Sequence, residues 1–157
     1  MKMTLVSEFE IPGEIVPQQR PRASVVGGHA RVHDVPKCAE FRNMVRIIAG
    51  QTWSKAVDET SPFLVMVTFH LSIPKSATKK MRKAIADCDL LPCKKPDLDN
   101  AAKGVLDAIT GVVWKDDSQV ASLVCDKFYS DKPRTKVAIY KYIRHDSEDY
   151  TSVVGIK

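Results

Sequence analysis

A run of twelve residues without any Asp, Glu, Lys or Arg, PFLVMVTFHLSI at positions 62–73, sets the strongest constraint on how this 157-residue chain folds. It is rich in β-branched and aromatic residues, with prolines at its start and just past its end, so it predicts a strand. A strand this apolar needs neighbours along both edges and cover on both faces. We therefore expect a sheet with residues 62–73 at its centre.

Patterns elsewhere predict the other strands of that sheet. Residues 4–11 alternate loosely between apolar and polar and end at a Pro-Gly pair, which indicates a first strand. Residues 121–130 and 134–143 are strand-like and flank SDKP, so we expect them to form a hairpin. The proline- and arginine-rich segment after the first strand is typical of a loop, with room for a small hairpin turning at Gly27-Gly28.

Three helices are predicted between these strands. Apolar residues recur at helical spacing over 37–57, which indicates an amphipathic helix that packs on the sheet. A short basic helix over 76–88 lies between two prolines, with Ser76 or Thr78 placed to cap it. A further helix runs over 97–110 and stops at a glycine.

The order of these elements predicts an α/β protein of the α+β type, with a mixed sheet of about four strands packed with two to three helices. A composition of 44% hydrophobic and 27% charged residues fits one globular domain, which we expect over residues 1–144, followed by a tail over 145–157. No apolar run is long enough to span a bilayer, and the N-terminus lacks the core of a signal peptide. We therefore expect a cytoplasmic protein that does not bind membranes.

Several common kinds of site are excluded by spacing. DLDN opens like a calcium-binding EF-hand loop, but Ala102 stands where glycine is needed and Ala108 where the bidentate glutamate is needed. No Lys-Ser or Lys-Thr follows the Gly27-Gly28 pair, so a phosphate-binding P-loop is absent, and the histidines stand in no motif with a nucleophile. The cysteines do not have zinc-site spacing and are expected to be reduced; they are Cys38, Cys88, Cys93 and Cys125.

The richest chemistry lies in KPDLDNAAKGVLDAITGVVWKDDSQV, residues 95–120, an acidic stretch in a chain whose net charge is +5. On the predicted helix, Asp99, Lys103 and Asp107 share an arc of about 80° beside the apolar side. Asp97 and Asp99 also have a purely structural explanation. A carboxylate at the N-cap accepts backbone N–H bonds, and an acid in the first turn is favoured by the helix dipole.

The second acidic pair, Asp116-Asp117, is harder to explain by structure alone. It follows a short apolar turn that can bring it back toward the helix start, although Asp-Asp-Ser can also cap a helical turn. Carboxylates that converge on one point repel one another unless a cation lies between them, and such hard ligands suit Mg²⁺ or Mn²⁺. A metal there would activate water toward a phosphodiester, and the ammonium of Lys103 would stabilise the developing charge. The pattern favours phosphodiester hydrolysis.

Basic residues elsewhere supply the opposite charge. The isoelectric point near 9.0 suits an anionic partner such as nucleic acid. A charge run is also typical of a solvated face, so each basic segment alone is a weak signal. Around an acidic centre that would otherwise repel DNA, however, basic residues fit a nuclease that must neutralise several phosphates. The candidate substrate contacts are Arg20, Arg22, Lys79, Lys80, Lys94, Lys95 and Asn100.

These motifs together resemble one known family. Asp-x-Asp-Asn, a lysine six residues after the first aspartate, LDAITG and a downstream DDSQV stand in the order found in the RusA family of Holliday junction resolvases, endodeoxyribonucleases of bacteria and their phages. The N-terminal IPGEIVPQQRPR also looks like that family's first strand and loop. The resemblance covers most of residues 5–143, and its tightest part is residues 95–120.

The resemblance implies a small mixed α/β homodimer that binds branched DNA and resolves Holliday junctions by symmetric, Mg²⁺-dependent cleavage, with Mn²⁺ expected to substitute. By position, Asp97, Asp99 and Asp117 would be the metal-binding catalytic carboxylates and Lys103 the catalytic lysine. Asp116 is the less certain metal ligand. Two-fold symmetry fits this activity independently, because a four-way junction needs two matched nicks.

Two alternatives stay open at this level. A non-catalytic protein that binds branched DNA could keep the same fold, and a structural protein could use these acids only to cap helices. The chain also departs from the family pattern: Ala101 and Ala102 stand where larger apolar residues are frequent, and residues 74–94 look additional.

Overall fold

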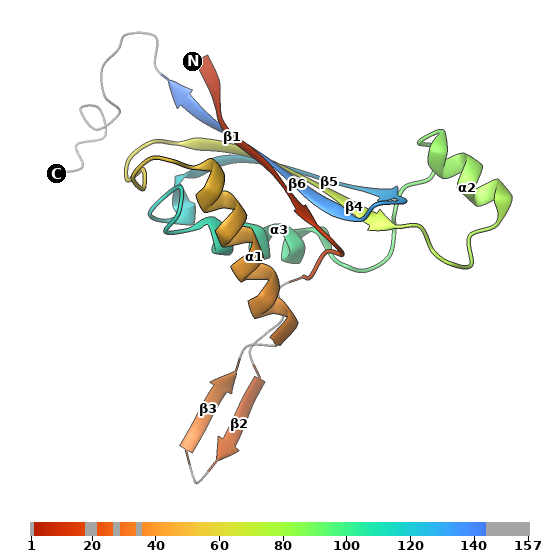
Figure 1. Ribbon diagram of the computed structural model, residues 1–157, viewed down its shortest axis with the longest axis horizontal. Helices are drawn as coiled ribbons and strands as arrows, with labels where there is room; N and C mark the ends of the chain where they lie inside the picture. The colour runs from red at the N-terminus through yellow and green to blue at the C-terminus, as the bar shows by residue number, and fades with distance from the viewer. Residues whose placement is uncertain (1, 18–21, 27–28, 34–35, 144–157) are drawn as a thin grey trace.

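The computed structural model describes residues 2–17, 22–26, 29–33 and 36–143, with 22–26 and 29–33 described by their backbone alone. In chain order the elements are β1 (Lys2–Pro12), β2 (Arg22–Val26), β3 (His29–His33), α1 (Pro36–Thr52), β4 (Phe63–Ser72), α2 (Lys79–Ala86), α3 (Leu98–Ile109), the 3-10 turn η1 (Asp117–Gln119), β5 (Val120–Ser130) and β6 (Arg134–Ile143). Figure 1 shows one sheet with helices against it and a separate β2–β3 hairpin. The tail predicted over 145–157 lies outside the described residues.

The main sheet is mixed and has four strands in the order β1-β6-β4-β5. Strand β6 runs antiparallel to both β1 and β4, whereas β5 runs parallel to β4. Together with α1, α2 and α3, this confirms the predicted α+β class. Strand β4, which contains the apolar run, is an inner strand as predicted, and both of its edges are hydrogen-bonded to neighbours.

The predicted hairpin between β5 and β6 is wrong, because β4 lies between these strands. The turn signal correctly marks a reversal of the chain. Arg134 holds this turn by donating to the carbonyl oxygen of Lys132 at 2.9 Å and to Oγ of Ser130 at 3.1 Å. A turn sets only the direction of the chain. The hydrogen-bonding neighbour is decided by the burial of the most apolar strand between the other two.

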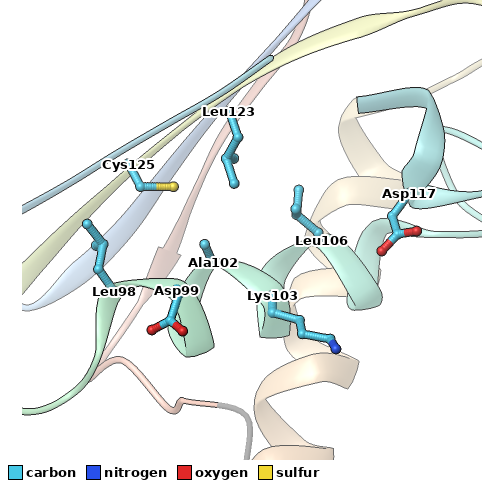
Figure 2. A pocket seen from close by; sticks show the side chains of 8 residues that line it. All are labelled: Leu98, Asp99, Ala102, Lys103, Leu106, Asp117, Leu123 and Cys125. Carbon is cyan, nitrogen blue, oxygen red and sulfur yellow. The ribbon is translucent and has the colours of Figure 1, made fainter. Parts of the chain in front are cut away.

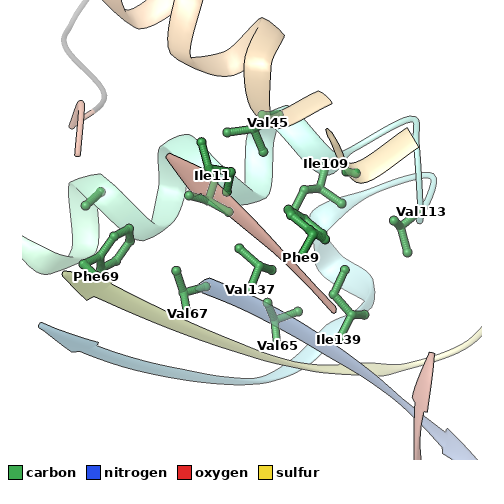
Figure 3. Packing of buried hydrophobic residues seen from close by; sticks show 14 of the residues in the cluster. Phe9, Ile11, Val45, Val65, Val67, Phe69, Ile109, Val113, Val137 and Ile139 are labelled. Atoms are coloured by element: carbon green, nitrogen blue, oxygen red, sulfur yellow. The ribbon is translucent and has the colours of Figure 1, made fainter. Parts of the chain in front are cut away.

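Helices cover only one face of the sheet in the described part of the chain. Helices α1 and α3 pack against it (Figure 1), and Figure 3 shows the core between the layers, where Val65 and Val67 of β4 lie near Val45 of α1 and Ile109 of α3. The alternate residues of β4 face the other way, and Met66 there is 38% exposed. The predicted cover on both faces of β4 is therefore not found among these residues, and its second face leaves apolar side chains open.

The helices differ from their predicted lengths at the ends. Helix α1 stops at Thr52, five residues before the predicted end at 57. Trp53 still donates its backbone N–H to Ala49 O at 2.9 Å, but its indole N–H donates to Ala56 O at 3.2 Å and the chain turns away. The described residues contain no helix with the length and apolar character to cross a membrane.

The basic helix α2 is shorter than predicted and stands apart. It begins after Thr78, whose side chain accepts a hydrogen bond from the backbone N–H of Met81 at 3.3 Å, so Thr78 is the cap that the sequence left open against Ser76. Figure 1 shows α2 projecting at one end of the sheet, away from α1 and α3. Its basic side chains are exposed there.

Candidate active site

Helix α3 carries the first acidic pair at the rim of the core. One side of the helix is buried through small and branched residues, including Ala101, Ala102 and Val105, which let it lie close against its neighbours. Asp99 in the first turn and Lys103 one turn later are both exposed. Apolar burial on one side therefore places both charged groups at the edge where solvent and a substrate can reach them.

Asp97 does not act as the helix cap that a structural explanation requires. It occupies the N-cap position in extended conformation, yet its side chain makes no capping hydrogen bond. The carboxylate is exposed. Capping of α3 therefore does not explain the aspartate at this position, and its carboxylate is available for another role.

The loop before Asp97 is held by a lysine on β5. Lys127 donates from Nζ to the carbonyl oxygen of Lys94 at 3.0 Å and to that of Pro96 at 3.3 Å. Hydrogen bonds from a charged donor are stronger than neutral ones, and this lysine is partly buried. Lys127 therefore ties the segment that leads into α3 to the edge strand of the sheet.

The turn after α3 sends the chain back toward the sheet. Gly111 adopts a φ of +79°, a left-handed conformation that glycine takes without strain. Trp114 is fully buried, its indole N–H donates to Oγ1 of Thr110 at 3.1 Å, and its ring centroid lies 5.5 Å from that of Phe63. This anchor fixes where the second acidic pair begins.

The two members of the second pair have different roles. The carboxylate of Asp116 caps η1 by accepting the backbone N–H of Ser118 at 2.9 Å. Hydrogen bonds from the side chain and backbone of Ser118 lower the pKa of Asp116. The capping role that the sequence allowed for Asp-Asp-Ser is therefore real and is filled by Asp116, whose pKa is also lowered by a hydrogen bond with the side chain of Asp117.

Gln119 connects this acidic turn to the segment that precedes β4. Its Oε1 accepts the backbone N–H groups of Lys115 at 2.9 Å and Asp116 at 3.2 Å. Its Nε2 donates to the carbonyl oxygens of Asp58 at 3.1 Å and Ser61 at 3.2 Å. One amide side chain thus satisfies four backbone groups and holds the turn that presents Asp117.

Asp58 in turn anchors that segment to β6. Its carboxylate accepts from the backbone N–H groups of Thr60 at 3.1 Å and Ser61 at 2.8 Å, and from Nζ of Lys141 at 2.8 Å. Burial opposes ionisation of Asp58, but the hydrogen bonds from Lys141, Ser61 and Thr60 outweigh it and lower the pKa to about 2. Asp58, whose carbonyl oxygen accepts a hydrogen bond from Gln119, therefore has an ionised side chain at neutral pH.

A cleft of about 810 Å³ opens between α3, η1 and β5, and Figure 2 shows the side chains around it. Asp99 and Lys103 enter from α3 and Asp117 from η1, and Lys103 falls between the two carboxylates in this view. The chain thus brings together groups that lie eighteen positions apart in the sequence. Asp97 and Asp116 are not among the lining residues.

The donor set fits a hard cation that is completed by substrate. No group of three or more His, Cys, Asp or Glu side chains that could hold a metal occurs in the described ranges, so the expected gathering of three carboxylates is not seen there. Mg²⁺, however, is usually bound through one or two carboxylates together with water and substrate phosphates. Asp99 and Asp117 on one cleft offer such a set.

The other predicted site residues are spread along the surface. Lys94, Lys95 and Asn100 are exposed around the start of α3, and Lys79 and Lys80 are exposed on α2. Of the remaining two, Arg20 lies outside the described residues and Arg22 begins β2, where only the backbone is described.

Asp107 does not join the cleft, although it shares the predicted arc with Asp99 and Lys103. It lines a separate cavity with Arg42 and Arg46 of α1. Helix α3 therefore presents Asp99 to the cleft and Asp107 to the cavity beside α1.

An acidic cleft on a small α+β fold with a basic surface is typical of a phosphodiester-cutting nuclease. Comparison with known proteins agrees: the family described as Endodeoxyribonuclease RusA matches residues 12–140. The chain belongs to this family, which implies endodeoxyribonuclease activity, binding of branched DNA and, in general, dependence on a divalent metal. It is also 40% identical over 134 residues to the uncharacterized protein YqaN of Bacillus subtilis (strain 168), an alignment that covers 84% of this chain and 94% of that protein.

Three residues that support the site were missed by sequence reasoning. Gln119 had a local signal, because Asp116-x-x-Gln119 is the spacing of a capping box, and the structure contains that box. Asp58 had a local signal for only part of its role. Its carboxylate accepts from Thr60 and Ser61 at the spacing of an Asx turn, but its bond from Lys141 spans 83 positions. Lys127 had no local signal, because its partners lie 33 and 31 positions away in the chain.

Replacing Gln119 should loosen the acidic turn more than it harms the fold. We expect Gln119→Leu to remove four hydrogen bonds, although Lys115 N–H and Asp58 O keep the bond between them. The loss should destabilise the protein by about 1–3 kcal/mol and lower nuclease activity about 10- to 100-fold. Thermal unfolding and cleavage of branched DNA measure the two effects. Nicking at the wild-type rate by a folded Gln119→Leu protein would contradict this role.

The Asp58–Lys141 pair should make stability depend on acid pH. Because the folded-state pKa of Asp58 is about 2, below its ordinary value of 3.8, its contribution is present above about pH 4 and is lost as the pH falls toward 2. We expect Asp58→Asn to cost about 1–2 kcal/mol at pH 7, allowing for solvent screening at the partly exposed lysine. Urea unfolding at several pH values should show the two proteins converging near pH 2. A constant difference would argue against the ion pair.

Proposed function

We propose that this protein is a Mg²⁺-dependent endonuclease that resolves Holliday junctions by symmetric phosphodiester hydrolysis in DNA recombination and repair. The observation that supports it best is that Asp99 and Asp117, from separate segments, border one cleft with Lys103. Membership of the RusA family supports the nuclease class. Mn²⁺ is expected to substitute, since it accepts the same hard ligands.

Each acidic residue has a proposed role in holding the reacting groups. Asp99 and Asp117 supply carboxylate oxygens from opposite segments of the cleft, and Asp97, which is free of a capping role, is the proposed third metal ligand. When bound, Mg²⁺ lowers the pKa of water and neutralises phosphate charge. By holding the ion, the carboxylates would fix where the scissile phosphate binds relative to the attacking water.

Lys103 is the proposed catalytic cation. No ion pair joins its ammonium to a carboxylate among the described residues, so it can approach the substrate. As water adds to phosphorus and the bond to the leaving oxygen breaks, negative charge grows on that oxygen. An ammonium beside it stabilises the charge or supplies a proton. Asn100, exposed in the same helix turn as Asp99, is the proposed orienting group.

The substrate is proposed to lie across the basic surface around this cleft. Lys94 and Lys95 precede α3, while Lys79 and Lys80 extend from the projecting helix α2 (Figure 1). Arg20 and Arg22 are proposed as further contacts from the region around β2. Lysine and arginine contacts to phosphates supply affinity with little sequence information, which suits recognition of branched DNA by shape.

We propose that the open face of the sheet joins two copies of the chain. Met3, Leu5, Met66 and Val124 are exposed large hydrophobic residues on strands of this sheet, and the register places Met66 beside Val124. A patch of this kind is unusual on a monomer. A second copy is the fitting occupant, because a two-fold dimer supplies the matched pair of active sites that a four-way junction needs.

The neighbouring aspartates offer a matched test of the proposed site. With Mg²⁺ and a labelled synthetic four-way junction, we expect Asp117→Asn, Asp99→Asn and Lys103→Met to lose nicking about 10²- to 10³-fold. Asp116→Asn should stay near wild type, because asparagine caps a helical turn as well as aspartate does. All four variants should still bind the junction in a gel-shift assay.

The outcomes separate the proposed enzyme from its alternative. A wild-type protein that binds junctions but leaves no nicked duplex with Mg²⁺ or Mn²⁺ is a non-catalytic branched-DNA-binding protein on the same fold. Equal losses at Asp116 and Asp117 would contradict the assignment of roles within that pair.

The dimer is tested by placing a charge at the centre of the open face. We expect Met66→Lys to weaken self-association about 100-fold or more, because the new ammonium would be buried without a partner. Ile47→Lys is the control, since Ile47 is 61% exposed on α1, away from this face. Light scattering over a concentration series measures the mass. Dimers of equal stability in both variants would place the interface elsewhere.

A further inference from the structure

The candidate cleft is larger than a metal and a phosphate require, and most of its wall is apolar. Leu98, Ala102 and Leu106 of α3 form one side, and Leu123 and Cys125 of β5 form the other. Figure 2 shows these side chains facing a common space, with the charged groups along the helix side and at the η1 end. The polar site thus continues into an apolar slot.

Leu123 is the least expected of these residues. Its register partner on β4 is Val65, which is fully buried on the helix-covered face, yet Leu123 itself is 44% exposed. Strand β5 is at the edge of the sheet, and no strand of the described residues pairs with its outer side. An exposed leucine in a concave site beside charged groups is typical of a ligand-binding wall.

Cys125 adds to the apolar character of the slot. Burial, helped by the charge of Asp126, raises the pKa of this thiol to about 11, so it is neutral at physiological pH. All four cysteines are free. The slot therefore offers aliphatic carbon and one neutral sulfur, and no described residue lines it with an amide or hydroxyl side chain.

A ligand that fits both parts must carry an anionic group next to a flat apolar one. A nucleotide has this chemistry: a phosphodiester for the carboxylates and Lys103, and a base ring for the slot between two aliphatic walls. Unstacking a base costs a few kcal/mol and costs least where pairing is already disturbed. Burial of the ring in an apolar site offsets part of that cost.

We propose that the slot formed by Leu98, Ala102, Leu106, Leu123 and Cys125 takes one unstacked nucleobase next to the phosphate held at the acidic site. This inference rests on the proposed nuclease function and deepens it. Because the lining lacks side chains that could read the edge of a base, the slot registers that a base is unstacked and not which base it is. It therefore favours branch points over continuous duplex.

The test uses 2-aminopurine, an adenine analogue that is dim when stacked and bright when unstacked. Placed in turn at each nucleotide flanking the branch of a synthetic junction, with Ca²⁺ in place of Mg²⁺ and gels to verify that no strand is cut, it should brighten at one position by about twofold or more when wild-type protein binds. Among the residues that the structure describes, no aromatic side chain lines the slot, so the base should not be quenched there. The same analogue in linear duplex should not respond.

Three variants make the test specific. Leu123→Ala removes one wall and Cys125→Phe fills the slot, and both should abolish the rise while junction binding by gel shift changes little. Ile47→Ala is the control, because this aliphatic residue is also exposed, at 61%, but lies on α1 outside the slot. Thermal unfolding checks that each variant is folded, and Leu123→Ala, at an exposed position, serves if Cys125→Phe does not fold.

The inference is overturned if no flanking position brightens while wild-type protein binds the junction, or if the rise persists in Leu123→Ala. It is also overturned if Leu123→Ala changes the mass measured by light scattering without changing the fluorescence, because a second copy of the chain would then occupy the slot. Failure of wild-type protein to nick junctions with Mg²⁺ is a separate result that counts against the proposed function.

Discussion

The amide of Gln119 is the interaction on which the site depends most. Its four hydrogen bonds join the turn that carries Asp117 to the segment that leads into the central strand. Two backbone hydrogen bonds join the same segments, from Asp58 N–H to Val113 O at 2.8 Å and from Lys115 N–H to Asp58 O at 3.2 Å. Together these contacts constrain where the turn with Asp117 lies before a cation arrives. The side-chain amide of Gln119 contributes to this constraint without adding a charge near the cleft.

The acids and bases of the chain divide into supporting and reacting groups. Asp58 and Asp116 are used by hydrogen bonds within the fold, and each has a lowered pKa as a result. Asp99 and Asp117 instead border the cleft. The lysines divide in the same way: Lys127 and Lys141 hold backbone and carboxylate groups in place, whereas Lys103 remains on the rim. Residues of the same type thus serve either to hold the fold or to face the cleft.

The parts of this arrangement that sequence could predict are those encoded locally. Helix α3, its glycine stop and the short turn at Asp117 follow from spacing and capping patterns, and the family motif lies within the same block. The neighbours of β4 and the roles of Asp58 and Lys127 could not be predicted, because they are set by contacts between distant segments. The division of labour between Asp116 and Asp117 also needed the structure, since both residues satisfy the same local pattern until one is seen to cap η1.

Anomalous diffraction from crystals soaked in Mn²⁺ would reveal whether carboxylates from two segments of the chain hold one divalent ion in this cleft. We expect a manganese peak between Asp99 and Asp117, with carboxylate oxygens of both within about 2.2 Å. Crystals grown with a bound junction should show the same peak with a phosphate oxygen added. Manganese bound elsewhere on the surface, with no peak in the cleft in either crystal, would contradict it.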